Sequence, residues 1–311
     1  MAFSPYTDIA PGRNWDQYSV DDILSKLSVI RNYFSIISTY GMGVADYNRG
    51  KNWDQCDSNA LIARAASILN QQGGGPKLTV NIGVFQLGDA DQQREIDNAY
   101  AAAAEANSRS PGTVTGITFT NEYIHSVAEG DKVLKMIRNN KNRGLLVGTR
   151  TEICGVYTNK EDPLRGIMNA IAQESNYIYC NIYPSEADAN KGPVAAADAV
   201  ANYFFYVQSE IKKVNPNLTV MIGETGWPSA GNSFNNSPNS PQNELGYWDR
   251  MNWWASNTQI KIQMFQAIDE PWKGDSSQFK GEGHYGLWYK PNNNAAGLVE
   301  KTAWNQEVLV L

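Results

Sequence analysis

Cysteine and histidine are scarce in this chain of 311 residues, which holds three cysteines and two histidines. Cys56, Cys154 and Cys180 form no Cys-x-x-Cys spacing, so the sequence does not favour a zinc site. Two histidines are too few for a histidine-rich metal centre, and at most one disulfide bond can form within the chain. We therefore expect no metal or organic cofactor, and we look for chemistry that side chains carry alone.

Long apolar runs and basic runs are missing as well. No run of eighteen apolar residues occurs, so we expect no membrane span. The net charge is −6 and there is no run of lysine and arginine, which argues against nucleic acid as a partner. No signal peptide is visible at the start of the sequence. Either the protein is intracellular or the sequence begins after a removed leader.

The chain is rich in aromatic rings, with nine tryptophans and sixteen tyrosines. Flat amphipathic rings suit the apolar faces of sugars, although many of these rings will simply pack in the core. Hydrophobic residues make up 42% of the chain, which is enough for one large barrel or two smaller domains. These features make a neutral ligand such as a sugar a candidate.

Strand-like and helix-like segments alternate along the whole chain. The strand candidates are short, apolar and rich in β-branched or aromatic residues, as buried parallel strands are. Asp57 and Pro193 are start signals for two of the helix candidates. We predict strands over residues 34–40, 78–87, 114–121, 145–151, 177–183, 218–224 and 260–268, and helices over 58–71, 91–107, 193–214, 243–256 and 295–306.

The spacing of these segments predicts an α/β fold, a single (β/α)8 TIM barrel over residues 1–311. The predicted strands begin roughly 31 to 44 residues apart, which is the length of a βαβ repeat. A short strand near residues 2–4 would bring their number to eight. The rival fold, a doubly wound open sheet, needs a glycine-rich phosphate turn after an early strand. The run Gly73 to Gly75 precedes a strand instead.

Two glutamates close two of the predicted strands. Glu122 follows the strand 114–121, and Glu224 ends the strand 218–224, which would be strands four and seven of a barrel. A carboxylate at the tip of a buried strand is costly to desolvate, so chance rarely leaves one there. In a barrel the C-terminal strand ends carry the chemistry. Two carboxyls can cleave a glycosidic bond when one is protonated and the other ionised, so both glutamates are catalytic candidates.

Candidate substrate contacts lie beside these glutamates or at the ends of neighbouring strands. Asn121 can hydrogen-bond a sugar hydroxyl, and Lys273 could keep Glu224 ionised. Aromatic side chains at strand ends can stack on sugar rings. The candidates from this reasoning are Asn121, Tyr183, Trp227, Trp272 and Lys273, with Glu152 as a candidate for a more distant subsite.

The residues around both glutamates form motifs in a consistent chain order. Thr120 to Tyr123 reads Thr-Asn-Glu-Tyr, and Gly223 to Ser229 reads Gly-Glu-Thr-Gly-Trp-Pro-Ser. They resemble the acid/base and nucleophile signatures of glycoside hydrolase family 17, the β-1,3-glucanases and β-1,3-glucanosyltransferases. Segments 181–184, 265–273 and 282–287 resemble further elements of that family, and the resemblance spans most of the chain.

The resemblance implies a (β/α)8 barrel and a retaining mechanism. Glu122 would be the general acid/base, and Glu224 would be the nucleophile that forms a covalent glucosyl-enzyme. The implied partner is a β-1,3-glucan oligosaccharide or polysaccharide, and we expect a monomer that is secreted or bound in the cell wall. One position departs from the family, which usually has arginine where Ser38 stands. The residues implied to support catalysis or bind sugar are Tyr40, Asn121, Tyr183, Glu270, Lys273 and Glu282.

Two other functions remain open. One is a retaining barrel glycosidase that acts on another β-glycan, such as a β-1,4-glucan or a mannan, although the motif 225–228 argues against it. The other is a non-catalytic glucan-binding protein of the cell wall, although both glutamates are present. Within the first hypothesis, hydrolysis and glucan transfer share one covalent intermediate. The likeness to fungal wall-remodelling members favours transfer.

Overall fold

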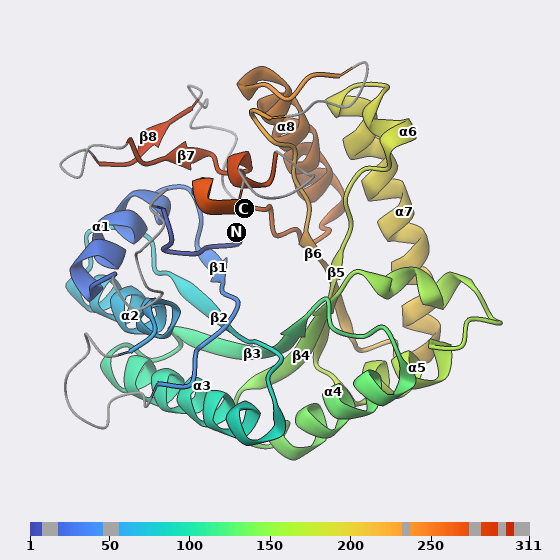
Figure 1. Cartoon of the computed structure of the whole chain (residues 1–311), viewed down its shortest axis with the longest axis horizontal. Helices are drawn as coiled ribbons and strands as arrows, with labels where there is room; N and C mark the ends of the chain where they lie inside the picture. Colours follow the sequence, from blue (N-terminus) through green and yellow to red (C-terminus); the bar gives the residue numbers. More distant parts are fainter. Residues whose placement is uncertain (8–17, 46–55, 232–236, 274–280, 292–296, 302–311) are drawn as a thin grey trace.

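The computed structural model describes residues 1–7, 18–45, 56–231, 237–273, 281–291 and 297–301. Six parallel strands follow one another in chain order and curl around a common axis, and helices cover their outer side (Figure 1). This arrangement confirms the predicted fold class. The strands are β1 Ile36–Ser38, β2 Thr79–Val84, β3 Val114–Asn121, β4 Leu146–Thr151, β5 Tyr177–Asn181 and β6 Thr219–Glu224.

Two short segments occupy the places of the first and eighth strands. Ala2 forms an isolated parallel bridge with β1 and exchanges backbone hydrogen bonds of 3.0 Å with Met264 and Ala267. Ile262 forms a parallel bridge with Ile222 of β6. These contacts connect β1 to β6 through residue 2 and the segment 262–267. The strand predicted over 260–268 is therefore present only as isolated bridges, yet it closes the barrel.

The register shifts at two places near the C-terminal ends of the strands. One shift lies between Phe119 and Asn121, where β3 pairs with β4. The other lies between Cys180 and Asn181, where β5 pairs with β6. Irregularities of this kind re-aim side chains and are frequent next to active sites. Both occur where the sequence predicts the catalytic end of the barrel.

Helix start signals act where the sequence places them. Asp57 caps the 3-10 turn before α2, accepting from the backbone N–H of Asn59, and Pro193 stands in the first turn of α7. The helices are α1 Val20–Ile30, α2 Ile62–Gln72, α3 Asp89–Arg109, α4 Val127–Asn140, α5 Arg165–Glu174, α6 Glu186–Ala189, α7 Pro193–Val214 and α8 Pro241–Thr258. The 3-10 turns are η2 Ser58–Leu61, η3 Ile153–Thr158, η4 Pro271–Lys273 and η5 Glu282–His284.

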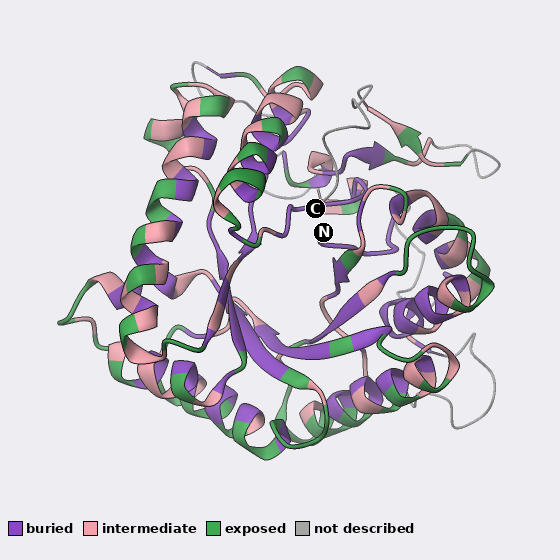
Figure 2. Cartoon of the chain, turned by 180° about the vertical axis from the view of Figure 1, so that it is seen from behind, coloured by how far each residue is buried: buried purple, intermediate pink, exposed green. Residues whose placement is uncertain are grey.

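The apolar core lies between the sheet and the surrounding helices. Figure 2 shows buried residues on the strands and on the inward faces of the helices. The other face of the strands, inside the barrel, carries polar side chains. There Asn81 donates a hydrogen bond of 2.9 Å to the hydroxyl of Tyr177, which satisfies both buried groups. The interior can therefore hold a polar layer beneath the candidate site.

A two-stranded hairpin follows the barrel near the C-terminal end of the chain. It consists of β7 Trp288–Tyr289 and β8 Val299–Glu300 and lies beside α1 (Figure 1). The edge of the Trp288 ring meets Tyr33, with 5.2 Å between the ring centroids. The helix predicted over 295–306 is wrong at β8, because those residues pair with β7. Residues 292–296 and 302–311 lie outside the described residues.

A disulfide bond joins Cys154 in η3 to Cys180 in β5, with a Cα–Cα distance of 5.7 Å. It ties the loop after β4 to the next strand at the end of the barrel that carries the candidate site. Cys56 is buried. Among the described residues, no helix is both long and apolar enough to cross a membrane.

Candidate active site

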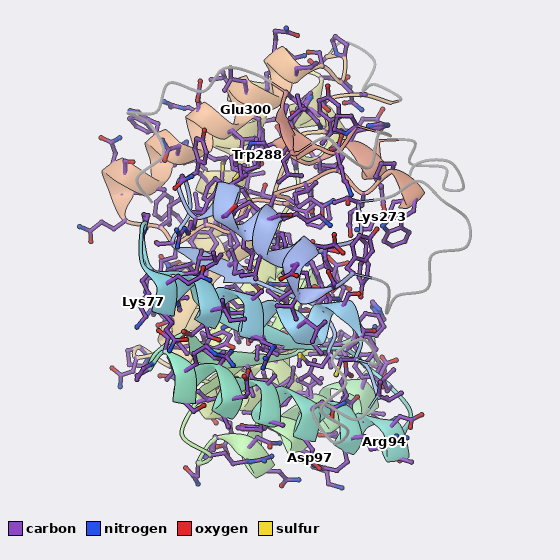
Figure 3. The ribbon with its side chains drawn as sticks, turned by 90° about the vertical axis from the view of Figure 1, so that its left-hand side faces the viewer. Lys77, Arg94, Asp97, Lys273, Trp288 and Glu300 are labelled. Atoms are coloured by element: carbon purple, nitrogen blue, oxygen red, sulfur yellow. A yellow bond between two sulfur atoms is a disulfide. The ribbon has the colours of Figure 1, made fainter. Side chains whose placement is uncertain are left out.

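The two candidate catalytic glutamates line one cavity at the C-terminal ends of the strands. Its volume is about 1040 Å³. In the side view of Figure 3, Lys273 marks this end of the barrel, and Lys77, which precedes β2, lies at the opposite end. The predicted contacts that line the same cavity as Glu122 and Glu224 are Tyr40, Asn121, Tyr183, Glu270, Trp272, Lys273 and Glu282.

Glu122 is held in an unusual backbone conformation. Its φ angle is +51°, and that of Thr120 is +64°, in the left-handed region that side-chain-bearing residues seldom adopt. The backbone N–H of Glu122 donates a hydrogen bond of 3.1 Å to the carbonyl of Arg150 on β4. Strained backbone of this kind persists where the surrounding structure fixes it, often at functional sites. Here it turns the end of β3 over the cavity.

Asn181 links the two glutamates. Its side-chain amide donates to Glu122 Oε1 at 2.7 Å, and its backbone pairs with Glu224 across β5 and β6. The same amide lies 3.3 Å from Asn121 Oδ1. Asn181 therefore fixes the position of the Glu122 carboxyl relative to the strand that carries Glu224.

Glu224 is almost enclosed, with 6% of its surface exposed. Its Oε2 accepts a hydrogen bond of 3.3 Å from the Tyr183 hydroxyl, and its Oε1 lies 3.5 Å from Nη1 of Arg150. Burial raises the pKa of the Glu224 carboxyl above its ordinary value, and Arg150 exerts the largest opposing effect. The nearby Glu122 raises the same pKa further.

Aromatic rings form one wall of the cavity. Tyr183 meets Tyr285 edge to face at 5.9 Å, and Phe265 lies between these rings and Tyr40, at 5.5 Å from Tyr285 and 6.4 Å from Tyr40. Edge-to-face contacts hold rings in defined orientations. The wall thus keeps the Tyr183 hydroxyl directed at Glu224.

Residues after the eighth strand segment form the rim. Lys273 Nζ lies 2.5 Å from Glu270 Oε2, and its charge also lies 4.9 Å above the ring of Phe265. Trp272 beside it is 38% exposed and lines the cavity, as expected for a ring that can stack on a sugar. Lys273 lowers the pKa of Glu224 less than Arg150 does. The effect of Lys273 on Glu224 therefore has the predicted direction, although the nearest carboxylate of Lys273 is Glu270.

Trp227 departs from its predicted place. The ring is 1% exposed, packs against Tyr247 at 6.1 Å between centroids, and is not among the residues that line the cavity. It follows the nucleophile candidate in sequence, but the chain turns it into the core. We therefore read Trp227 as a packing residue that holds the segment after Glu224.

The site also contains three residues that were not predicted from the sequence, Arg150, Phe265 and Tyr285. Arg150 has an exposure of 1% and stands on β4, a strand otherwise read only as an apolar run. Its position gives a usable signal, because Gly148 and Arg150 share one face of the strand and Val147 the other. Glu152, the candidate for a more distant subsite, does not line the cavity, and its Oε1 lies 3.3 Å from Nδ1 of His125.

The site combines two carboxyls in different surroundings. Glu224 is buried beside a guanidinium, and Glu122 is more exposed and bonded to an amide. In such a pair one carboxyl can protonate a departing oxygen while the other, as a carboxylate, attacks carbon. Among the described residues, no group of three or more His, Cys, Asp or Glu side chains could hold a metal ion.

Comparison with known protein families gives a match over most of the chain. A profile of the BtgE/BtgC glycoside hydrolase domain matches residues 1–286. A glucan 1,3-beta-glucosidase from Candida albicans is 25% identical over an alignment of 164 residues that covers 42% of this chain and 52% of that protein. One from Saccharomyces cerevisiae is 27% identical over an alignment of 135 residues that covers 41% of each chain. The chain thus matches about half the length of these relatives or less.

Solved structures share the fold. A glycoside hydrolase family 17 β-1,3-glucanosyltransferase from Rhizomucor miehei has a TM-score of 0.64 and 19% identity, covering 95% of this chain and 97% of that one. An endo-laminarinase from Formosa has a TM-score of 0.68 and 18% identity, covering 92% of this chain and 83% of that one. At these identities the likeness establishes the TIM-barrel fold.

Proposed function

The chain belongs to the BtgE/BtgC glycoside hydrolase domain family, and we propose that it is a retaining enzyme that acts on β-1,3-glucan. It cleaves the glucan through a covalent glucosyl-enzyme and passes the glucosyl unit to another glucan, or to water. The observation that carries the proposal is the cavity that Glu122 and Glu224 both line, at the C-terminal ends of β3 and β6, which are barrel strands four and seven.

The names of similar proteins support the choice of substrate. The fungal relatives are glucan 1,3-beta-glucosidases, and the Rhizomucor miehei enzyme has been solved in complex with laminaritriose as an active-site mutant. The cavity in this chain has exposed rings at Trp272 and Phe85 that suit the apolar faces of glucose units. A neutral glucan also agrees with the net charge of −6.

The first half of the reaction forms the glucosyl-enzyme. A carboxylate oxygen of Glu224 attacks the anomeric carbon, and the bond from that carbon to the glycosidic oxygen breaks. Glu122 gives its proton to the departing oxygen. Arrangements for retention place the two carboxyl groups about 5–5.5 Å apart, and we predict that separation here.

The second half releases the sugar. Glu122, now a base, takes a proton from an acceptor hydroxyl or from water, whose oxygen attacks the anomeric carbon as the bond to Glu224 breaks. We propose that Tyr183 supports Glu224, because its hydroxyl donates a hydrogen bond to Oε2 of that carboxyl. Tyr40, Asn121, Glu270, Trp272, Lys273 and Glu282 are proposed to contact the sugars.

We further propose that residues 1–311 form one catalytic domain that acts as a monomer outside the cell or in the wall. The disulfide between Cys154 and Cys180 supports that location, because disulfides persist in oxidising compartments. The family profile ends at residue 286, but the chain after it also contacts the barrel. There Lys301 Nζ lies 2.7 Å from Asp269 Oδ1, at the end of the eighth strand segment.

Product analysis with laminari-oligosaccharides tests the proposal. The enzyme should consume them at high concentration and yield products longer than the substrate, which means transfer, with shorter products arising from hydrolysis. The control is Glu224→Ala, which should form neither. Turnover of a β-1,4-glucan or a mannan instead would refute the substrate assignment. Equal binding of laminari-oligosaccharides by wild type and Glu224→Ala, with turnover by neither, would favour the non-catalytic alternative.

A further inference from the structure

Arg150 is buried inside the barrel, next to Glu224 and Tyr40, which line the cavity. It stands on β4 opposite Asn121 of β3 and Tyr179 of β5, with 1% of its surface exposed. A guanidinium stays charged at all ordinary pH values, and an enclosed charge is costly unless an opposite charge compensates it. Arg150 therefore needs a negative charge beside it.

The contacts of the guanidinium single out Glu224. Nη1 lies 3.5 Å from Glu224 Oε1, and Nη2 donates to Ser38 Oγ and, at 3.2 Å, to Gln263 Oε1. The rings of Tyr40 and Tyr179 have their centroids 4.9 and 5.3 Å away. Among the described residues, Glu224 is the only carboxylate within ion-pair distance of Arg150.

The other cation near the site is committed elsewhere. Lys273 contacts Glu270 at 2.5 Å and lies over the rings of Phe265 and Trp272. Lys273 lowers the pKa of Glu224 less than Arg150 does. An ion pair between Arg150 and Glu224, both enclosed, is screened far less by solvent than one on the rim.

Ser38 makes this arrangement possible. It is fully buried on β1, across the barrel interior from β4, and its small side chain meets the guanidinium directly. A long side chain at position 38 would occupy the space that the guanidinium fills. Conversely, an arginine at position 38 could deliver its charge to the same place from the opposite wall.

We propose that Arg150 keeps the Glu224 carboxyl ionised, and that the serine at position 38 makes room for the Arg150 guanidinium. The cation next to Glu224 then comes from β4, the fifth strand of the barrel. Arg150 then acts on catalysis through the nucleophile. The kinetic part of this inference rests on the proposed function, whereas the charge state of Glu224 does not.

Other charged groups face the pair and enter any titration. Glu122, Tyr40 and Lys273 surround Glu224, and Tyr177 and Tyr179 face Arg150. The pKa of the Met1 amine is lowered to about 5, by burial first and Arg150 second. Because this amine titrates in the range of carboxyl groups, the experiment must follow Glu224 itself.

The experiment is a pH titration of carboxyl signals in protein labelled with ¹³C-glutamate, in which Glu224→Gln identifies the signal of Glu224. Arg150→Gln should raise its midpoint by about 1–3 pH units, the effect of losing an adjacent opposite charge. The matched control is Arg94→Gln, on the exposed helix α3 (Figure 3), which removes the same charge and should leave the midpoint unchanged. A wild-type midpoint in Arg150→Gln overturns the proposal.

Relocation of the charge provides a second test. Ser38→Arg/Arg150→Ser should return the midpoint toward the wild-type value, because the guanidinium reaches the same space from β1. A folded double variant with the raised midpoint of Arg150→Gln would contradict the role given to position 38. If Arg150→Gln does not fold, Glu224→Gln/Arg150→Gln decides. Folding of that double variant shows that Arg150 compensates Glu224, and failure to fold makes Arg150 a general packing residue and overturns the proposal.

Kinetics connects the titration to activity. In Arg150→Gln the acid limb of kcat/KM on a laminari-oligosaccharide should move to higher pH together with the Glu224 midpoint, because the nucleophile must be ionised. A limb that stays in place while the midpoint moves would refute the catalytic role. If the wild type turns over no β-1,3-glucan, the proposed function fails, and the titration still decides whether Arg150 sets the charge of Glu224.

Discussion

The side-chain amide of Asn181 donates a hydrogen bond of 2.7 Å to Oε1 of Glu122. Asn181 stands at the register shift between β5 and β6, where its backbone pairs with Glu224. The position of one candidate catalytic carboxyl is thus fixed by a residue that is itself paired with the other. Small displacements at Asn181 should therefore change the geometry of the whole pair.

Replacing Asn181 should reduce the rate of the chemical step. In Asn181→Ala the Glu122 carboxyl loses its donor, and we expect kcat to fall by about 100-fold, the loss that a misplacement of about 1 Å can cause. KM should change little. The matched variant Asn181→Asp keeps the shape but cannot donate, so it should lose a similar factor. Steady-state kinetics on a laminari-oligosaccharide measures both, and an unchanged kcat in either variant would remove Asn181 from the mechanism.

Removing the proposed nucleophile should stop turnover without abolishing binding. Glu224→Ala should lower kcat by about 10⁴-fold, because the covalent step is lost while the aromatic wall remains. Added azide should restore cleavage of a substrate with a good leaving group and give a glucosyl azide of inverted configuration. Chromatography and NMR of the product decide this. Rescue of Glu122→Ala with inversion would mean that the two roles are exchanged.

The Tyr183 hydroxyl should matter to catalysis and not to folding. Tyr183→Phe removes the donor to Glu224 Oε2 but keeps the ring against Phe265 and Tyr285. A hydrogen bond to a charged group is worth about 1.5–3 kcal/mol, so kcat should fall by about 10- to 100-fold. The melting temperature should stay close to that of the wild type. A lowered melting temperature with normal kcat would make Tyr183 a structural residue.

Two tryptophans should give opposite results. Trp272→Ala should weaken oligosaccharide binding by about 1–3 kcal/mol, by analogy with the stacking of nucleic-acid bases, and leave folding largely intact. Trp227→Ala should cost about 3–5 kcal/mol of folding free energy, since that ring is 1% exposed. Calorimetric titration and thermal melts on both variants separate the effects. Reversed results would place Trp272 in the core and Trp227 on the cavity.

Glu244 should make the fold less stable as the pH rises. Its carboxyl is 1% exposed, and burial raises its pKa well above the ordinary value, while Lys301 opposes this. Because the folded state holds this proton more tightly than the unfolded state, the stability contributed is full below the unfolded pKa of about 4.5 and is lost as the pH rises through the folded pKa. Glu244→Gln should therefore gain stability relative to wild type between pH 4 and 7. If the melting temperatures of Glu244→Gln and wild type change with pH in parallel, this prediction is wrong.

Local patterns in the sequence were sufficient for the framework of the barrel. The strand predicted over 114–121 and the helix over 193–214 have those bounds in the structure, because a buried β-branched run and an amphipathic run with proline in the first turn are local signals. The eighth strand segment, 260–268, forms only isolated bridges, since its pairing depends on Ile222 and Trp288, which lie elsewhere in the chain. The helix predicted over 295–306 failed at β8, where pairing with β7 overrides the local pattern.

The sequence by itself determined the family and the barrel and predicted the two candidate glutamates, because a carboxylate at the end of a buried strand and the motif around it are visible in a few consecutive residues. The tertiary structure decided the electrostatics around them. Which cation meets Glu224 depends on side chains from opposite walls of the barrel, Arg150 and Ser38, which lie 112 positions apart in the chain. Whether Trp227 faces the cavity or the core likewise depends on how the chain turns after β6. That turn cannot be predicted from the spacing of the motifs or from the composition of the chain.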